Sequence, residues 1–368
     1  MPQGTRDPDR LLLRHRPGPA PRRLGPVESQ NHYYGHSSAL ARYAGLDRPR
    51  HLPGLLQHGW TAASPLGTHF RDFPAIGTPA GPRDRALFVW SHRSRAWDPG
   101  TADRRTRAIG APWHYLCATA GPRPTGTGTV ILPVHGIATQ PLLGDHAAVA
   151  RAWADTEGPA TVCLYHVEAR DPEVVRAYAD AGHRLVTLGT RTDPAFLGRL
   201  HTLLTGAARV VSNRLSTPVV YAAAVGIDAS VSGDAMRLAG ERADDAGWLA
   251  ERWPEFYDVG TTLADRTAAA RAETGADDLL APDELRRLLG WDRRHAGPWL
   301  DHWLRAPAHR AATQLGRRAS GPASDAPAGD APSLSFGQWF AAATEYLPRP
   351  LGSAPAVPGE PLAVPVPA

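Results

Sequence analysis

The chain of 368 residues contains no lysine, so all 40 of its basic side chains, histidine aside, are arginine. Together with abundant alanine, glycine and proline, this points to a GC-rich genome more than to a functional choice. The formal net charge is only +4, which gives little support for a basic surface that binds nucleic acid. We therefore expect no nucleic acid as a partner. Arginine on the surface still suits anionic ligands or an anionic membrane face.

Cysteine and long apolar runs are also scarce. Cys117 and Cys163 are the only cysteines, too few for a disulfide framework, and Cys163 falls inside an expected strand, where burial is typical. The sequence has no run of about 18 apolar residues, so we expect no membrane-spanning helix. The apolar run Leu11-Leu12-Leu13 is too short for a signal peptide. The expected location is the cytoplasm, with peripheral membrane contact through an arginine-rich arm left open.

The motifs that identify many enzymes directly are missing. The sequence has no P-loop, no HExxH, no GxSxG and no CxxC pair. Its only D-x-D is Asp7-Pro8-Asp9, in an expected disordered arm, so a metal that holds a nucleotide diphosphate by this device is not expected. None of the 16 histidines falls in a cluster with zinc spacing. We predict no metal site and no cofactor.

Composition and periodicity divide the chain into tails, two α/β domains and a helical extension. The predicted divisions are a disordered arm over 1–30, an N-terminal domain over 31–119, a C-terminal domain over 129–235, a helical extension over 236–315, a linker over 316–334, a docking helix over 335–347 and a disordered tail over 348–368. In the second domain, strands alternate with helices that begin at a capping residue and end at glycine. This pattern predicts a doubly wound, mostly parallel sheet.

The expected elements follow from the same patterns. The N-terminal domain has a helix over 33–45 and strands over 54–57, 86–90 and 106–109. The C-terminal domain has strands over 130–134, 161–167, 184–188, 208–211 and 227–231, with helices over 145–157, 172–182, 194–206 and 218–226 between them. The extension has helices over 243–253, 259–274, 282–289 and 297–312.

The stretch 208–233 is a strand, a polar turn, a buried helix and a second strand. Thr217 followed by Pro218 predicts a helix start with a hydroxyl cap and proline at the first helical position. The turn offers hydroxyls, an amide, an arginine and backbone N–H groups at a helix N-terminus, which together suit a phosphate. The alternative is an ordinary turn between strand and helix that binds no ligand.

Other polar turns follow the expected strands, and parallel strands bring such turns to one edge of a sheet. His58 and His135 are candidate general bases, because imidazole accepts a proton near neutral pH; the alternative is a surface histidine beside a structural glycine. The candidate donor-binding side chains are His166, Glu168, Arg170, Arg191, Ser212, Asn213, Ser216 and Thr217. Glu168 suits ribose hydroxyls and Arg170 a phosphate, or the two form a solvated ion pair. The edge as a whole predicts an anionic ligand and leaves the reaction open.

Four stretches resemble motifs of the GT-B glycosyltransferase superfamily, in the branch with CDP-glycerol glycerophosphotransferases and capsule- or teichoic-acid-type polymer transferases. The stretches are Gln57-His58-Gly59-Trp60, Ile109-Gly110-Ala111-Pro112, the strand Val130 to His135, and Ser212 to Gly226. The first is similar to a W-H-G-T turn, the second to a G-x-P turn and the last to a D-x-S-S turn with its helix. The resemblance covers roughly residues 50 to 235.

This resemblance implies two Rossmann-like domains that face each other across a cleft. It implies transfer of a sugar or polyol phosphate from a nucleotide sugar or CDP-polyol to a glycan or polymer acceptor, without a metal. His58 would be the catalytic base, while Arg191, Asn213, Ser216 and Thr217 would hold the donor phosphates and Glu168 the ribose. The alternatives are a non-catalytic protein that binds a nucleotide or sugar phosphate, and a sugar-nucleotide epimerase on the same scaffold.

Overall fold

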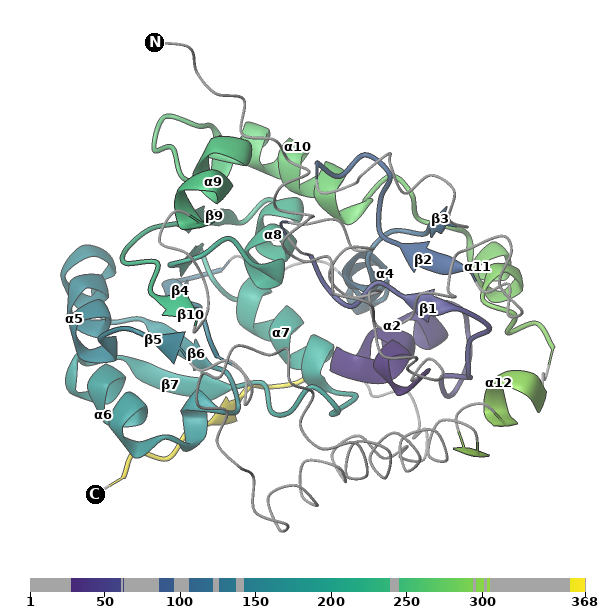
Figure 1. Ribbon diagram of the computed structural model, residues 1–368, viewed down its shortest axis with the longest axis horizontal. Helices are drawn as coiled ribbons and strands as arrows, with labels where there is room; N and C mark the ends of the chain where they lie inside the picture. The colour runs from purple at the N-terminus through teal and green to yellow at the C-terminus, as the bar shows by residue number, and fades with distance from the viewer. Residues whose placement is uncertain are drawn as a thin grey trace, which may run out of the picture.

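A computed structural model describes residues 28–60, 62, 86–95, 106–121, 126–136, 142–238, 245–293, 296–300, 303–304 and 358–367. This part of the chain is a mixed α/β structure with two sheets of mostly parallel strands (Figure 1). One sheet comes from the N-terminal third of the chain, and the other comes from its middle with one strand from the C-terminal end. The α/β class predicted from the sequence is therefore confirmed.

The larger sheet has six strands. They are β4 (Thr129–Ile131), β6 (Thr161–Leu164), β7 (Arg184–Thr187), β8 (Arg209–Ser212), β9 (Asp228–Val231) and β11 (Leu362–Ala363), in the order β11-β7-β6-β4-β8-β9. All neighbours pair in parallel except β11, which runs antiparallel to β7. The chain moves outward from β4 in one direction and then in the other, as in a doubly wound sheet. This reversal leaves a crevice at the carboxyl ends of the central strands.

Helices cover both faces of this sheet (Figure 1). One face carries α5 (His146–Glu157) and α6 (Pro172–Asp180), and the other carries α7 (Phe196–Thr205) and α8 (Thr217–Ala224). The middle residues of the central strands are apolar because both faces of the sheet are buried there. Ile131 and Val162 pack toward α5 and α6, whereas Val130 and Val210 pack toward α7 and α8. Cys163 is buried in the same layer, as expected for a small apolar side chain.

The predicted helix caps are confirmed at two of these helices. The carboxylate of Asp145 accepts a hydrogen bond from Ala148 N at 2.9 Å, and that of Asp171 accepts one from Glu173 N at 2.9 Å. Helix α7 begins at Phe196, later than predicted. Asp193 forms a turn of its own there and accepts from Ala195 N at 2.9 Å, so the following proline is not the first helical residue.

The smaller sheet has three parallel strands in the order β1-β2-β3. They are β1 (Leu55–Leu56), β2 (Leu87–Val89) and β3 (Thr106–Ala108), all three of which the sequence predicts. The 3-10 helix η1 (Glu28–Gly35) and helix α2 (His36–Tyr43) precede them. Helix α4 (Pro112–Ala120) follows them and was not predicted. It is apolar on most sides and buries Trp113, Tyr115 and Leu116, so it has no periodic pattern that would reveal a helix.

One continuous apolar core joins the two sheets. Helix α8 lies between them (Figure 1), and its Tyr221 ring stacks on Trp113 at 5.0 Å and on Trp90 at 5.3 Å between centroids. The predicted division between 119 and 129 therefore marks a change of sheet, and the buried side chains on its two sides belong to the same core.

The extension is helical, as predicted. It contains α9 (Asp245–Arg252), the 3-10 helix η4 (Pro254–Phe256), α10 (Leu263–Thr274), α11 (Pro282–Leu288) and α12 (Ala296–Leu300). Ala270 of α10 is buried in the core around α8, and Leu285 of α11 is buried beside the smaller sheet. The extension is thus part of the folded body.

Two predictions about the ends of the chain need correction, and one pair of strands was missed. The tail predicted as disordered over 348–368 is ordered over 358–367, where β11 pairs with β7 and Val364 is buried; a strand there covers the exposed edge of the sheet. The arm predicted over 1–30 gives way to η1 at Glu28. An antiparallel pair, β5 (Leu142–Leu143) and β10 (Arg237–Leu238), was not predicted. Residues 1–27, the linker 316–334 and the docking helix 335–347 lie outside the described residues.

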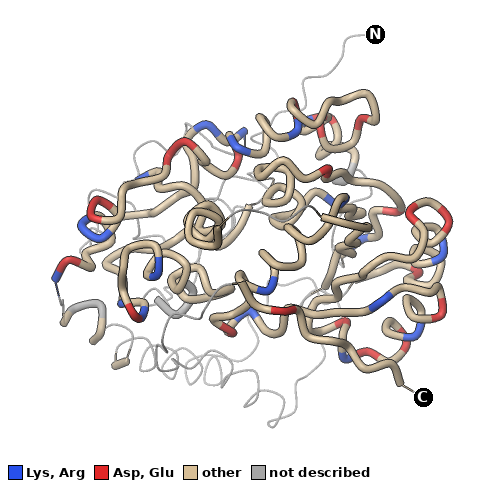
Figure 2. The backbone as a smooth tube through the Cα atoms, turned by 180° about the vertical axis from the view of Figure 1, so that it is seen from behind, with Lys and Arg blue, Asp and Glu red and all other residues tan. Residues whose placement is uncertain are grey.

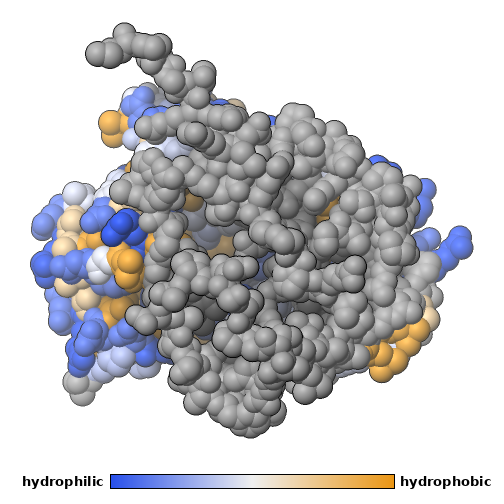
Figure 3. Space-filling view, in the orientation of Figure 1, coloured by the Kyte–Doolittle hydropathy of each residue, from blue (hydrophilic) through white to orange (hydrophobic). Residues whose placement is uncertain are grey.

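Charged residues of both signs alternate over the outer helices and loops (Figure 2). Some of them join elements: Arg209 of β8 pairs with Glu157 at 2.9 Å and with Asp228 at 2.7 Å. Polar and apolar residues lie side by side over α5 and α6 (Figure 3), as on a solvated helix face. No helix in the described ranges is long and apolar enough to cross a membrane.

Candidate functional site

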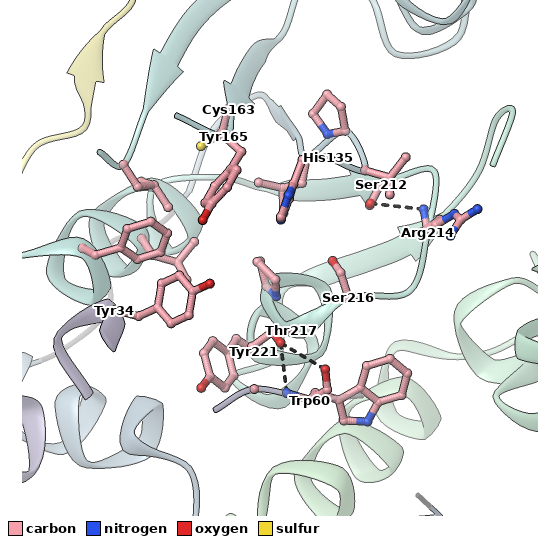
Figure 4. Close-up of a pocket in the computed structure, with 18 of the residues that line it drawn as sticks. Tyr34, Trp60, His135, Cys163, Tyr165, Ser212, Arg214, Ser216, Thr217 and Tyr221 are labelled. Atoms are coloured by element: carbon pink, nitrogen blue, oxygen red, sulfur yellow. Dashed lines mark hydrogen bonds between the residues drawn. The ribbon is translucent and has the colours of Figure 1, made fainter. Parts of the chain in front are cut away.

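A cavity of about 370 Å³ lies at the carboxyl edge of the larger sheet, where this edge meets the turn that follows β1 (Figure 4). Its upper wall comes from the segments after β4, β6 and β7, and its floor from the start of α8. The turn 58–60 closes the side that faces the smaller sheet. A ligand in this cavity would touch both sheets at once.

The turn after β1 is fixed by the side chain of Gln57. This buried amide donates to Gly59 O at 2.9 Å and accepts from Trp90 N at 2.9 Å. It therefore ties the turn to the end of β2 and presents the half-buried His58 to the cavity.

A second set of bonds ties the same turn to the C-terminal helices. Trp60 N donates to Thr217 Oγ1 at 3.0 Å, the bond drawn in Figure 4. The Trp60 indole donates to Glu273 Oε2 at 2.9 Å, while Trp253 donates to Glu273 Oε1 at 2.7 Å. Gly59 passes so close to α8 that an added Cβ would lie 3.0 Å from Thr217 Oγ1. Two elements more than 150 residues apart in sequence are held in contact here.

Helix α8 begins one residue earlier than the sequence predicts. Ser216 is its capping residue and Thr217 its first helical residue, and Pro218 occupies the second position. The Ser216 side chain makes no capping hydrogen bond and lines the cavity instead. The Thr217 hydroxyl is engaged by the backbone of Trp60. Of the two hydroxyls, that of Ser216 is the better placed for a ligand.

The turn between β8 and α8 is braced by Asn213 and Arg214. Asn213 accepts from Val134 N at 2.7 Å and donates to Asp234 O at 2.7 Å. Arg214 donates to Ala235 O at 2.8 Å and to Met236 O at 2.6 Å. Asn213 thus joins the loop after β9 to the segment after β4, and Arg214 holds the same loop against the turn, so the position of the turn is fixed.

His135 stands at the end of the segment after β4, and its ring stacks on Tyr165 at 4.1 Å between centroids. Its Nδ1 lies 2.9 Å from Gly136 O. Because a carbonyl oxygen only accepts, Nδ1 carries the hydrogen, and Nε2 of the neutral ring keeps its lone pair. The ring points into the cavity (Figure 4). His135 is therefore a second possible base beside His58.

Glu168 holds the His135–Gly136 segment through its carboxylate. The buried carboxylate accepts from Gly136 N at 2.7 Å. Burial raises the pKa of Glu168, although the hydrogen bond from Gly136 opposes this. Its second oxygen has no hydrogen-bond partner among the residues that the structure describes. The carboxylate positions the His135–Gly136 segment and does not reach the cavity lining.

Ten site residues were predicted from the sequence, and the structure brings five of them to this cavity. These five are His58, His135, Ser212, Ser216 and Thr217. The other five, which are not among the residues lining it, are His166, Glu168, Arg170, Arg191 and Asn213. His166 packs against the Tyr165 ring at 4.2 Å, and the guanidinium of Arg191 lies over the Tyr33 ring at 5.0 Å.

The cavity also contains aromatic residues that the sequence did not single out, chiefly Tyr34, Tyr165, Phe196 and Tyr221. Tyr165 directly follows β6, so the strand-end rule that selected its neighbour His166 could have found it. Tyr34 belongs to the segment before the first strand, and no pattern in the sequence places that segment at the edge of the other sheet.

The walls of the cavity favour an anionic or neutral ligand. No Asp or Glu is among the described residues that line it, and Arg214 is the one lining residue with a permanent charge among them. The N-terminus of α8 adds the positive end of a helix dipole. Within the described ranges, no group of three or more His, Cys, Asp or Glu side chains could hold a metal ion.

No family model, curated protein or solved structure matches the chain.

Proposed function

We propose that this protein transfers a sugar or a polyol phosphate from a nucleotide-activated donor to a hydroxyl of a glycan or polymer acceptor. The observation that carries the proposal is one cavity lined from both sides. The turn after the smaller sheet's β1 contributes His58, and the segment after the larger sheet's β8 contributes Ser216 with the N-terminus of α8. A candidate base and a helix N-terminus then flank the same space, an arrangement that suits group transfer from a phosphorylated donor.

The fold supports the interpretation of the two sheets as the two Rossmann-like halves of a GT-B-like enzyme. The five parallel strands follow the order β7-β6-β4-β8-β9, in which the chain reverses direction beside the cavity. On the other side lies the sheet of three parallel strands, and its strand β1 leads into the turn with His58. In this interpretation the larger sheet binds the donor and the smaller sheet presents the acceptor.

In the proposed reaction His58 removes the proton of the acceptor hydroxyl. For a sugar donor, the acceptor oxygen then bonds to the anomeric carbon while the bond from that carbon to the nucleoside diphosphate breaks. For a CDP-polyol, the new bond forms at phosphorus and CMP leaves. The first N–H groups of α8 and the Ser216 hydroxyl stabilise the leaving phosphate, and His135 faces the donor side of the same space.

This proposal changes the roles given to several predicted residues. Asn213 and Glu168 act by positioning the turns that carry Ser216 and His135. Arg191 holds the segment around Tyr33. The donor contacts fall to Ser212, Ser216 and the backbone of α8, with no metal or cofactor in the scheme.

A thermal-shift series tests donor binding. UDP-, CDP-, GDP- and dTDP-linked sugars and polyols are each added to the full-length protein. At least one should raise the melting temperature, because a ligand bound only to the folded state stabilises it by mass action. No shift with any of them would remove the basis for a donor site.

Turnover then tests the reaction. With the donor that binds and a polysaccharide acceptor, His58→Ala should lower nucleotide release by about 10²- to 10⁴-fold, the usual contribution of a general base. His92→Ala is the control, because His92 lies after β2 and bonds to Thr106 at 2.9 Å, outside the cavity lining. Donor binding without release would favour a binding protein, and conversion of the donor without an acceptor would favour an epimerase.

A further inference from the structure

Tyr34 enters the cavity in a backbone conformation that non-glycine residues rarely adopt. Its φ of 56° and ψ of 14° are left-handed, and the preceding residue, Tyr33, is extended. For a bulky side chain this conformation costs free energy and persists only where the surroundings enforce it. Strained residues of this kind cluster at ligand-binding positions. Tyr34 is therefore a candidate ligand-binding residue.

Contacts to both sheets hold the Tyr34 backbone. Tyr34 N donates to Arg191 O at 2.6 Å, in the loop after β7. At Gly35, whose φ is 74°, an added Cβ would lie 2.2 Å from Pro194 O, so the chain is pressed against that loop. On the other side the Asn31 side chain donates to Gly54 O at 3.0 Å and accepts from Leu56 N at 2.8 Å. The segment 31–35 thus clamps the two sheets together beside the cavity.

The side chain of Tyr34 lies against both the candidate base His58 and the first residue of helix α7, Phe196. Its ring is 5.0 Å from that of His58 and 4.9 Å from that of Phe196. The phenol groups of Tyr34 and Tyr165 face each other in the cavity (Figure 4). Burial, with the phenol of Tyr165 nearby, raises the pKa of Tyr34 above its ordinary value. Tyr34 therefore stays protonated over the working range of pH.

We infer that the phenols of Tyr34 and Tyr165 together bind the hydroxyl-bearing group of the ligand, a sugar or a polyol, next to His58. The two phenols hydrogen-bond to each other, and the pair still has one O–H hydrogen and further lone pairs, so it can donate to and accept from a sugar hydroxyl beside it. A phosphate is better placed across the cavity, at Ser216 and the start of α8. This assignment rests on the proposed function and adds a specificity site to it.

Paired titrations test the inference. Isothermal titration calorimetry of the full-length protein compares UDP-glucose with UDP and CDP-glycerol with CDP. For the pair that binds, Tyr34→Phe should weaken binding of the sugar- or polyol-linked compound about five- to tenfold, as expected for one lost neutral hydrogen bond. Its affinity for the free nucleotide should not change. Tyr43→Phe is the matched control, because Tyr43 packs on Tyr115 at 4.8 Å, outside the cavity lining.

Equal losses for both members of a pair, or no loss for either, would overturn the inference. Tyr165→Phe should show the same selective loss and takes the place of Tyr34→Phe if that variant does not fold. If the wild type binds none of these four compounds and none of the nucleotide-linked compounds of the thermal-shift series, the proposed function fails, and glucose 1-phosphate and glycerol 3-phosphate become the probes. Binding of either that Tyr34→Phe weakens would support the phenol site independently, whereas no binding by the wild type would reject it.

Discussion

At the scale of residues, Asn213 and Glu168 show how far strand-end chemistry can be read from a sequence. Both are predicted to lie at the carboxyl edge of the larger sheet, and both lie there. Their side chains, however, bond to Val134 N and Gly136 N, which belong to a segment about 30 to 80 residues away. Sequence reasoning finds the edge, but it cannot tell a side chain that faces the cavity from one that braces the neighbouring loop.

Tyr34 was missed for a related reason. Its position depends on a left-handed backbone and on a glycine that packs against Pro194. The sequence shows the pair Tyr34-Gly35 but not the loop that it meets. The aromatic wall of the cavity is therefore a product of tertiary contacts, in contrast to His58 and Ser216, which local motifs identify.

His114 gives a prediction about acid stability. It is buried on α4, and its Nε2 lies 2.7 Å from Thr274 Oγ1 of α10. Burial lowers the pKa of His114 from 6.5 to about 4. The folded state then binds fewer protons than the unfolded state between these values, so the free energy of unfolding should fall as the pH drops from about 6.5 to about 4.

The expected loss from this one group is about 3 kcal/mol. His114→Gln keeps a hydrogen-bond donor but cannot titrate, so its stability should depend less on pH in this range. Urea denaturation at a series of pH values measures the difference. Parallel curves for the wild type and the variant would mean that His114 is not buried as a neutral ring.

At the scale of elements, most strands and helices of the larger sheet follow from the sequence because local rules agree there. Asp145 and Asp171 cap their helices as predicted, and the strands are short β-branched runs between them. The elements that were missed have no such local signal. Helix α4 is apolar on most sides, while β5, β10 and β11 are two-residue strands that exist only through pairing with distant partners.

Helix α8 supplies the most specific prediction at this scale. Thr217→Val should destabilise the fold by about 1 to 3 kcal/mol, because Trp60 N would lose its acceptor in a partly buried place. Ser216→Ala should cost little stability, since Ser216 makes no capping bond, yet it should weaken donor binding. Chemical denaturation and calorimetry measure the two effects. Equal loss of stability in both variants would show that Ser216 has a structural role.

At the scale of the whole molecule, the two predicted domains share one core. Trp90, Trp113 and Tyr221 stack across the junction, and Glu273 bonds to both Trp60 and Trp253. The sequence predicts the change from one sheet to the next near residue 120. It does not reveal this shared core, because the contributing aromatics come from separate parts of the chain.

The shared core predicts cooperative unfolding. Differential scanning calorimetry should give one transition, with a calorimetric enthalpy close to the van't Hoff enthalpy. Two independent domains would instead give two transitions, which a donor would shift unequally. Trp113→Ala should lower the melting temperature of the whole transition, because it removes a large side chain that joins the two sheets.

The most direct test of the proposed function is a crystal structure with the nucleotide-linked compound that gives the largest thermal shift. We predict that its phosphates lie within hydrogen-bond distance, about 3 Å, of Ser216 and the first N–H groups of α8, with the group to be transferred beside His58. Binding at another place, such as the polar cavity at the opposite edge of the sheet between Thr127 and Glu360, would contradict the account.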